Sequence, residues 1–448
     1  MKKFNFEGLS GHIVTRDVFS YECDRKQWNR AIEKYPLAIV YCLSEKDIIN
    51  AIMWARENSV GIRIRSGGHH YEGYSNGNDV LIIDVSKMNR IILDEEKKVL
   101  KIQGGVRNRE LYEATGKAGY PFPGGGCPTV GAVGFTLGGG WGYSSRMFGL
   151  GCDSLIAAEV IDYRGEKLIV NEKENEELLW ALKGSGGGNY GVVTSLTFKL
   201  PEKVQNATLI NIDCPNLHKE DMVQLFLIYQ HMFKNLDHRC NLKMAVYNSK
   251  EKGIGVKFTG IFYGTRKEAN LAVMPIKAFE GDLCITMKYM SVFKVNEEIQ
   301  DSHPDYESYK SGGRFVLRDY SKEEAEALVG LIENSAKGST YTAISLYGLG
   351  GKVSEGDKTL AAFAWRDAAF IMGIQSVWED SVYAENNRAW TIEKYNVIKQ
   401  YTQGAFVNFP FAENESYLED YYRDNKKRLK ALREKYDPYR IFGSEQGL

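Results

Sequence analysis

Two glycine-rich stretches of the sequence carry nucleophilic side chains. The first, Arg65-Ser-Gly-Gly-His-His-Tyr-Glu-Gly73, contains His69, and the second, over residues 121–151, contains Cys127. Small residues let consecutive backbone N–H groups converge, so the first loop can form a nest for an anion such as a pyrophosphate. An imidazole there can act as a nucleophile, although composition alone favours an ordinary polar loop histidine.

Cys127 lies between Gly126 and Pro128, whereas a packing cysteine usually lies on an apolar strand or helix. Its thiol is open to three interpretations: a catalytic nucleophile, a redox sensor or an inert free thiol. The seven cysteines show no CxxC spacing. His69 and His70 are adjacent, so their rings would point to opposite faces of an extended chain. We therefore expect neither a disulfide framework nor a metal site.

Two other glycine motifs do not predict nucleotide chemistry. Residues 186–191 match GxGxxG, but they follow a predicted helix and precede a predicted strand, the reverse of the Rossmann order. Gly350-Gly-Lys352 lacks the earlier glycine of a phosphate-binding loop, because Leu346 stands in its place. NAD binding and nucleotide hydrolysis are therefore not expected.

The loops are flanked by regular elements that would position them. The pattern predicts a strand over 37–43, a helix over 44–59 capped by Ser44 with Asp47 in its first turn, and a strand over 60–66. Further predicted strands cover 80–86, 155–163, 192–200, 209–214, 242–248, 254–263, 343–348, 361–367 and 371–378. Further predicted helices cover 108–119, 176–184, 218–233, 265–279 and 416–438.

Length and charge limit the class of protein. A chain of 448 residues is too long for one ordinary compact domain, so two or three lobes are expected. Lys plus Arg number 57 against 58 for Asp plus Glu, which disfavours a nucleic-acid or anionic-lipid partner. No apolar run approaches the ~20 residues that span a bilayer, and the start lacks a secretory signal. We expect a cytoplasmic monomer or homodimer that binds a small molecule.

Four segments together resemble a known family. Residues 63–75, 123–150, 177–200 and 435–442 are similar in order and spacing to the berberine bridge enzyme-like branch of the vanillyl-alcohol oxidase flavoproteins. The resemblance implies an α+β fold with a two-lobed PCMH-type FAD-binding domain at 1–205. It also implies a substrate domain at 206–399, an antiparallel sheet covered by helices, and a C-terminal segment at 400–448 that returns to the FAD domain.

The same resemblance implies a bicovalent FAD. His69 corresponds to the 8α-histidyl ligand and Cys127 to the 6-S-cysteinyl ligand. Val130 stands at the family's oxygen-gating position, and a valine there implies O2 as acceptor and H2O2 as product. The remaining implied cofactor contacts are Arg65, Ser66, Gly67, Gly68, His70, Gly131, Gly134, Gly138, Asn189, Gly191, Val193 and Asn408.

The sequence departs from the family at the catalytic base. Many relatives have YxNY, but this chain reads Phe406-Val-Asn-Phe409, and a phenyl ring cannot take a proton. The base therefore lies elsewhere, or the reaction needs no strong base, as in the oxidation of a neutral amine. Tyr71 is the first candidate for an acid, base or orienting phenol, against simple packing on the ring. Gln375 can orient a substrate but cannot act as a base.

Three functions remain open. The first is oxidation of an alcohol or amine of medium size and partly apolar character, with Trp141, Phe406 and Phe409 lining the pocket. The second is a carbohydrate oxidase that forms a lactone, although those aromatic residues supply few hydrogen bonds. The third is a flavin-carrying scaffold protein with weak redox activity.

Overall fold

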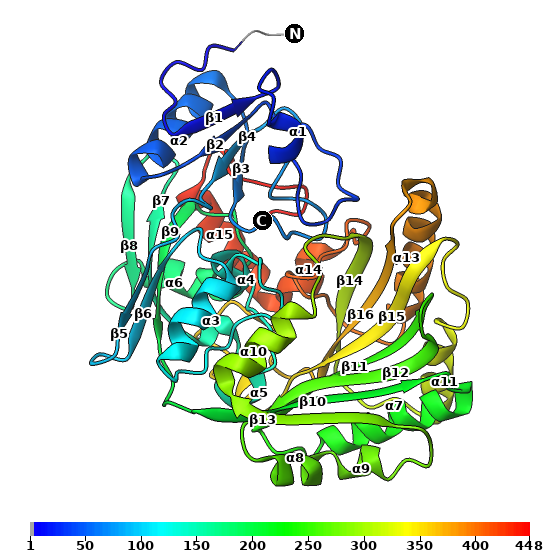
Figure 1. Cartoon of the computed structure of the whole chain (residues 1–448). Helices are drawn as coiled ribbons and strands as arrows, with labels where there is room; N and C mark the ends of the chain where they lie inside the picture. Colours follow the sequence, from blue (N-terminus) through cyan, green and yellow to red (C-terminus); the bar gives the residue numbers. More distant parts are fainter. Residues whose placement is uncertain (1–3) are drawn as a thin grey trace.

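A strand–helix–strand unit at the start of the chain builds the first sheet. The structure is a computed structural model, and it describes residues 4–448 (Figure 1). Strand β2 (Ala38–Tyr41), helix α2 (Glu45–Asn58) and strand β3 (Ile62–Arg65) confirm the predicted unit, and Ser44 and Asp47 form a capping box. The sheet order is β1-β2-β4-β3. Its other elements are β1 (His12–Thr15), α1 (Tyr21–Asp24) and β4 (Leu81–Asp84).

A five-stranded antiparallel sheet of order β5-β6-β9-β7-β8 completes the first lobe. Its buried face packs under helices through residues such as Leu100, Leu196 and Phe198. Its strands are β5 (Ile91–Asp94), β6 (Val99–Gln103), β7 (Leu155–Ile161), β8 (Lys167–Asn171) and β9 (Val192–Lys199). The helices are α3 (Asn108–Lys117), α4 (Ala132–Leu137), α5 (Ser145–Phe148), η1 (Gly151–Ser154) and α6 (Glu176–Leu182).

The second lobe is a seven-stranded antiparallel sheet of order β13-β10-β12-β11-β15-β16-β14. Its strands are β10 (Asn206–Pro215), β11 (Cys240–Ser249), β12 (Gly253–Phe262), β13 (Cys284–Ser291), β14 (Ser308–Val316), β15 (Ser339–Gly348) and β16 (Phe370–Trp378). One face forms a large core under helices. Those helices are α7 (Lys219–Phe233), α8 (Arg266–Ala272), α9 (Met274–Lys277), α11 (Lys322–Gly330) and α13 (Ala384–Ile398). The opposite face turns toward the first lobe (Figure 1).

Helix α10 (Val292–Asp301) and Arg146 are among the contacts that join the lobes. Helix α10 lies between α3 and the end of the seven-stranded sheet (Figure 1). Arg146 of α5 is buried and donates to the carbonyl oxygens of Leu236, Cys240 and Leu349, at 2.7, 2.9 and 2.6 Å. Because a buried guanidinium needs such partners, these bonds fix the second lobe against the first.

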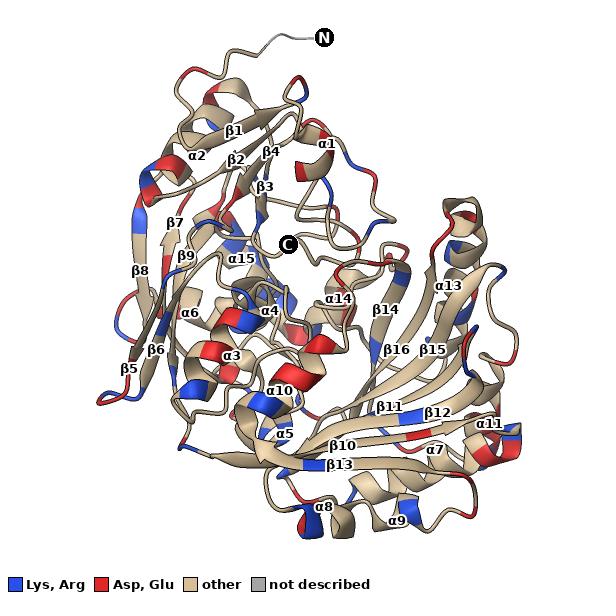
Figure 2. Cartoon of the chain, viewed as in Figure 1, with Lys and Arg blue, Asp and Glu red and all other residues tan. Residues whose placement is uncertain are grey.

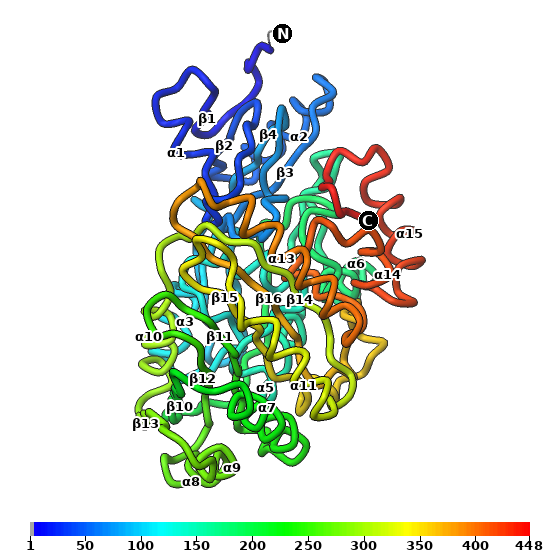
Figure 3. Tube along the Cα trace, turned by 90° about the vertical axis from the view of Figure 1, so that its right-hand side faces the viewer, coloured from blue at the N-terminus to red at the C-terminus, as the bar shows by residue number. Residues whose placement is uncertain are grey.

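The C-terminal segment packs on the first lobe. Helix α15 (Lys426–Tyr436) contacts α6, and Figure 3 shows α14 (Tyr417–Tyr422) and α15 on the same side as α6. The single helix predicted over 416–438 is wrong, because Arg423 takes a left-handed φ of 47° and separates the two helices. A short turn, η3 (Arg423–Asn425), lies between them.

Two other predicted elements are also wrong. Residues 361–367 form no strand, because Ala362 and Phe363 donate their N–H groups to Trp180 and Lys183 at the end of α6. The helix predicted over 265–279 divides into α8 and α9 just before Pro275, which cannot donate to a preceding turn. The short helix α12 (Lys352–Glu355) and the turn η2 (Ser381–Tyr383) complete the described elements.

The α+β fold is confirmed, and the chain passes from the first lobe to the second between Lys199 and Asn206. Acidic and basic residues are interspersed over both lobes (Figure 2). Within residues 4–448, every helix is too short or too polar to cross a bilayer.

Candidate active site

The two glycine-rich loops pack directly on each other. A side chain at Gly131 would collide with Ser66, and one at Gly67 would lie 2.7 Å from the carbonyl oxygen of Thr129. The first loop is anchored by Arg65, whose guanidinium pairs with the buried Asp84 and donates to the carbonyl oxygen of Asp24 at 2.7 Å. Glycine at the crossing point therefore lets the two loops meet backbone to backbone.

This packing brings His69 and Cys127 to one hydroxyl group. His69 Nε2 lies 2.7 Å from Thr129 Oγ1, and Cys127 Sγ lies 3.9 Å from the same oxygen. Trp28 stacks on the His69 ring with centroids 5.0 Å apart. Within residues 4–448, Nδ1 of His69 has no hydrogen-bond partner. The imidazole is thus held by one ring nitrogen and leaves the other available.

Burial sets the protonation state of both nucleophiles. It lowers the pKa of His69 to about 3, helped by the positive charge of Arg107, so the imidazole is neutral at physiological pH. Burial raises the pKa of the Cys127 thiol, which keeps that group protonated. The neighbouring His70 has different surroundings. The His70 ring packs on Tyr74, with the two ring centroids 4.7 Å apart.

The glycines predicted to contact a cofactor differ in the space around them. Side chains at Gly67, Gly131, Gly138 or Gly191 would collide with protein atoms, and at Gly138 the obstacle is Asn408, which donates to the carbonyl oxygen of Phe135 at 2.8 Å. A side chain at Gly68 would make an ordinary contact with Arg65, at 3.8 Å. A side chain at Gly134 would meet no protein atom within 4 Å, and Gly134 is exposed although it lies on α4.

Two residues predicted to lie near the nucleotide also have structural roles. Val193 is buried in the core of the first lobe. The side-chain oxygen of Asn189 accepts from Arg433 at 3.0 Å, and its nitrogen donates to Ser185. These side chains hold the C-terminal segment and the sheet together, and the contacts of both residues with a nucleotide stay a prediction. Val130, in contrast, is partly exposed.

A row of aromatic rings leads away from His69. Tyr71 stacks on Phe409 with centroids 5.2 Å apart, and Phe409 lies 5.2 Å from Tyr347. Burial raises the pKa of Tyr71 well above its ordinary value, so its phenol is a hydrogen-bond donor rather than a base. The row provides a continuous aromatic wall beside the two loops.

Trp141 and Phe406 do not line an open surface as predicted. Phe406 is 1% exposed and packs against Phe315 and Phe363. Trp141 is buried, and its indole nitrogen donates to the carbonyl oxygen of Gly348 at 2.7 Å. Both residues support the wall from behind, because they belong to an apolar cluster against which Tyr347 and Phe409 pack.

The sheet face opposite the large core is more polar than the sequence predicted. Gln375 pairs in register with Ser311 and Ala343, and its side chain is partly exposed. Neighbouring strands and loops add Lys243, Lys257, Glu307, Tyr341 and Tyr347. Sequence reasoning singled out none of these five, nor Thr129. For Lys243 and Lys257, the available signal in the sequence was a lysine within an otherwise apolar strand.

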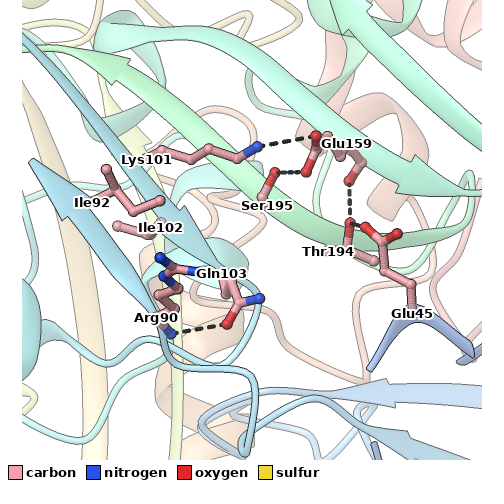
Figure 4. Close-up of a pocket in the computed structure, with 9 residues that line it drawn as sticks. All are labelled: Glu45, Arg90, Ile92, Lys101, Ile102, Gln103, Glu159, Thr194 and Ser195. Carbon is pink, nitrogen blue, oxygen red and sulfur yellow. Dashed lines mark hydrogen bonds and ion pairs between the residues drawn. The ribbon is translucent and has the colours of Figure 1, made fainter. Parts of the chain in front are cut away.

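A separate hollow of about 160 Å³ lies on the first lobe (Figure 4). It is lined by residues of the outer face of the five-stranded sheet, including Lys101 and Ser195, and by Glu45 of α2. Its polar groups are paired with one another: Glu159 accepts from Ser195 at 2.6 Å and pairs with Lys101 at 3.0 Å. This hollow offers no unpaired nucleophile and is not the candidate site.

Comparisons with known proteins place the chain in a family of flavoproteins. Residues 36–171 match a family model described as an FAD binding domain, and residues 405–448 match one described as berberine and berberine like. The chain is 31% identical over 448 residues to the uncharacterized FAD-linked oxidoreductase YvdP of Bacillus subtilis, covering 98% of each protein.

Solved structures share the fold. The BBE-like 1 protein of Physcomitrella patens is 24% identical, with a TM-score of 0.88 over 97% of this chain and 96% of that one. Glucooligosaccharide oxidase from Acremonium strictum, which carries a 6-S-cysteinyl, 8α-N1-histidyl FAD, is 22% identical, with a TM-score of 0.87 over 97% and 96% of the two chains.

The residues present fit an FAD. Open space beside Gly134 suits a planar ring, and a neutral imidazole and a thiol lie together near the crossing of the loops. The donor set is therefore the one that covalent flavin attachment requires.

Two glycine substitutions separate packing from cofactor contact. We expect Gly131→Ala to lower the melting temperature of flavin-free protein by at least about 4 °C, because its Cβ collides with the other loop. Gly134→Leu should leave that temperature within about 2 °C of the wild-type value, since no protein atom opposes it, yet abolish flavin binding. Calorimetry on protein from riboflavin-starved cells and flavin content on ordinary protein provide the measurements. Full flavin content in Gly134→Leu would contradict this placement.

Proposed function

Because the chain belongs to the berberine bridge enzyme-like family of FAD-linked oxidoreductases, we propose that it binds FAD through His69 and Cys127 and oxidises an alcohol or amine at the expense of O2. The observation that carries the proposal is the contact of both residues with the Thr129 hydroxyl. When bound, FAD supplies hydride acceptance from a substrate carbon and electron transfer to O2, which yields H2O2.

Thr129 orients the imidazole for attachment. A hydrogen bond from Nε2–H to Thr129 Oγ1 leaves the lone pair on His69 Nδ1, the nitrogen used in the 8α-N1-histidyl flavin of glucooligosaccharide oxidase. With FAD bound, attachment of His69 Nδ1 at the 8α carbon would break one C–H bond, release its proton to solvent and pass two electrons to O2. Attachment of Cys127 Sγ at C6 would break the S–H bond and a C–H bond, release two protons and likewise pass two electrons to O2.

Glu307 is the base that the family tyrosine would otherwise supply. Phe406 and Phe409 lack a hydroxyl group, and the raised pKa of Tyr71 keeps its phenol protonated. Glu307 is partly buried and interacts electrostatically with both Tyr71 and Cys127. Burial raises the pKa of its carboxyl group, which suits acceptance of a proton from a substrate hydroxyl or ammonium group. Tyr71 and Gln375 then orient the substrate.

The small side chain of Val130 is the basis for proposing O2 as the acceptor. It is partly exposed, three residues after Cys127, beside the helix that carries Gly134. A carbohydrate substrate is a second candidate, because the sheet face offers Gln375, Ser345, Tyr347 and lysine side chains for hydrogen bonding.

Four versions of the protein test the attachment sites. We expect wild type, His69→Ala and Cys127→Ala to retain flavin after acid precipitation, and only the double variant to release it. Each single variant should gain one flavin by intact mass, because one bond suffices to hold the ring. Flavin fluorescence on a denaturing gel gives an independent reading. Release of all flavin from the wild-type protein in acid would refute covalent attachment.

Substitution of Thr129 tests its orienting role. Thr129→Val keeps the volume but removes the hydroxyl group, so we expect attachment through His69 to slow by at least about tenfold in a Cys127→Ala background. Thr129→Ser keeps the hydroxyl and should attach flavin at nearly the wild-type rate. Flavin-free protein is mixed with FAD, quenched in acid at intervals and weighed by mass spectrometry. Equal rates in the two variants would refute the role.

Glu307→Gln tests the proposed base. We expect the rate of flavin reduction by an alcohol substrate to fall about 10²- to 10⁴-fold, with the flavin spectrum unchanged. In the wild-type protein the rate should fall as the pH is lowered through the Glu307 pKa, which lies above the ordinary carboxyl value because the group is buried. This acid limb should vanish in the variant. Glu298→Gln, which alters an exposed ion pair with Lys288, is the control. An acid limb retained in Glu307→Gln would exclude this base.

A further inference from the structure

Two lysines project from adjacent strands of the second lobe toward the first lobe. Lys243 on β11 lies between Leu242 and Met244, and Lys257 on β12 lies between Val256 and Phe258. Those four neighbours belong to the large core on the opposite face. Since successive side chains on a strand alternate between faces, both lysines lie on the face that carries Gln375. In register, Lys243 pairs with Thr259 and Lys257 with Ala245, so the two lysines are diagonal neighbours.

The carboxylates nearest this pair are engaged elsewhere. Asp213 pairs with Lys252 at 2.9 Å and accepts from Tyr247 at 2.9 Å, and Glu298 pairs with Lys288 at 2.8 Å. Within residues 4–448, no carboxylate oxygen lies within 4 Å of the amine of Lys243 or Lys257. Asp213, opposite Lys257 in register, and Glu307, near Lys243, act on these two amines only at longer range. With Lys252 included, three ammonium groups face two carboxyl groups. Placing two like charges side by side without partners is unfavourable unless an anion joins them.

The pair lies at the end of the aromatic wall. Lys243 Nζ is 4.8 Å from the centre of the Tyr347 ring, which in turn lies 5.2 Å from Phe409. Phe409 stacks on Tyr71, and Tyr71 follows His69 by two residues in the sequence. Lys257 is exposed in area, yet partial burial of its amine among neighbouring groups lowers its pKa. The wall thus connects the reactive end of the site with a positively charged end.

We propose that the substrate carries a carboxylate group, which Lys243 and Lys257 bind, while its aromatic or otherwise flat body lies along Tyr347 and Phe409. This inference rests on the proposed function for the position of the reacting carbon, but the anion site itself does not need the flavin. The sequence predicted a partly apolar substrate, whereas this site favours an acid with an apolar body. The carboxylate is separated from the oxidised carbon by at least one ring.

Paired probes of equal size test the charge preference. Isothermal titration calorimetry of the holoprotein compares 4-hydroxyphenylacetate with its neutral amide, 4-hydroxyphenylacetamide. We expect the acid to bind at least about tenfold more tightly, because ammonium–carboxylate hydrogen bonds are charge-assisted. Lys243→Gln and Lys257→Gln should each reduce this ratio, and the double variant should abolish it. Lys322→Gln, which removes an exposed ammonium on helix α11 that pairs with Glu326, should retain the ratio.

The outcomes separate this inference from the proposed function. Three outcomes overturn the anion site: equal binding of acid and amide, a preference that survives in the double variant, or no binding of the acid at millimolar concentration. Each does so even if the flavin of that protein is attached and reducible by dithionite. A preference that depends on both lysines in protein that lacks covalent flavin supports the anion site and contradicts the attachment instead.

Discussion

Two loops from different parts of the first lobe bring a histidine and a cysteine to the same hydroxyl group only because glycine occupies their crossing point. Gly67 and Gly131 approach so closely that a methyl group on either would meet backbone or Ser66. The buried Arg65–Asp84 pair holds one loop, and the short helix α4 begins directly after the other. The chemistry of His69 and Cys127 therefore depends on a steric constraint more than on any single attractive contact.

The rest of the molecule holds the second lobe against the first. Arg146, with three carbonyl partners from the second lobe, fixes the large sheet in front of the loops. Phe406 and Trp141 are buried behind the wall formed by Tyr71, Phe409 and Tyr347. Buried rings thus back the aromatic wall, and in the proposed function the polar groups along it orient the substrate.

Local signals in the sequence predicted local structure well. The Ser44–Asp47 cap predicted α2, and the motifs around His69 and Cys127 identified the family through their spacing. Features that depend on distant partners were missed. The role of Thr129 requires two loops to meet across 60 residues, and the shared face of Lys243 and Lys257 follows from strand register. Residues 361–367 were predicted to form a strand because they are mostly apolar. The backbone N–H groups of Ala362 and Phe363 instead donate to the end of α6.

The most direct test of the account is tandem mass spectrometry of a proteolytic digest of the purified protein. The account predicts one species in which the peptide containing His69 and the peptide containing Cys127 are joined through a single flavin, with fragment ions that place the bonds on these two residues. Recovery of both peptides unmodified, with the flavin free in solution, would contradict it.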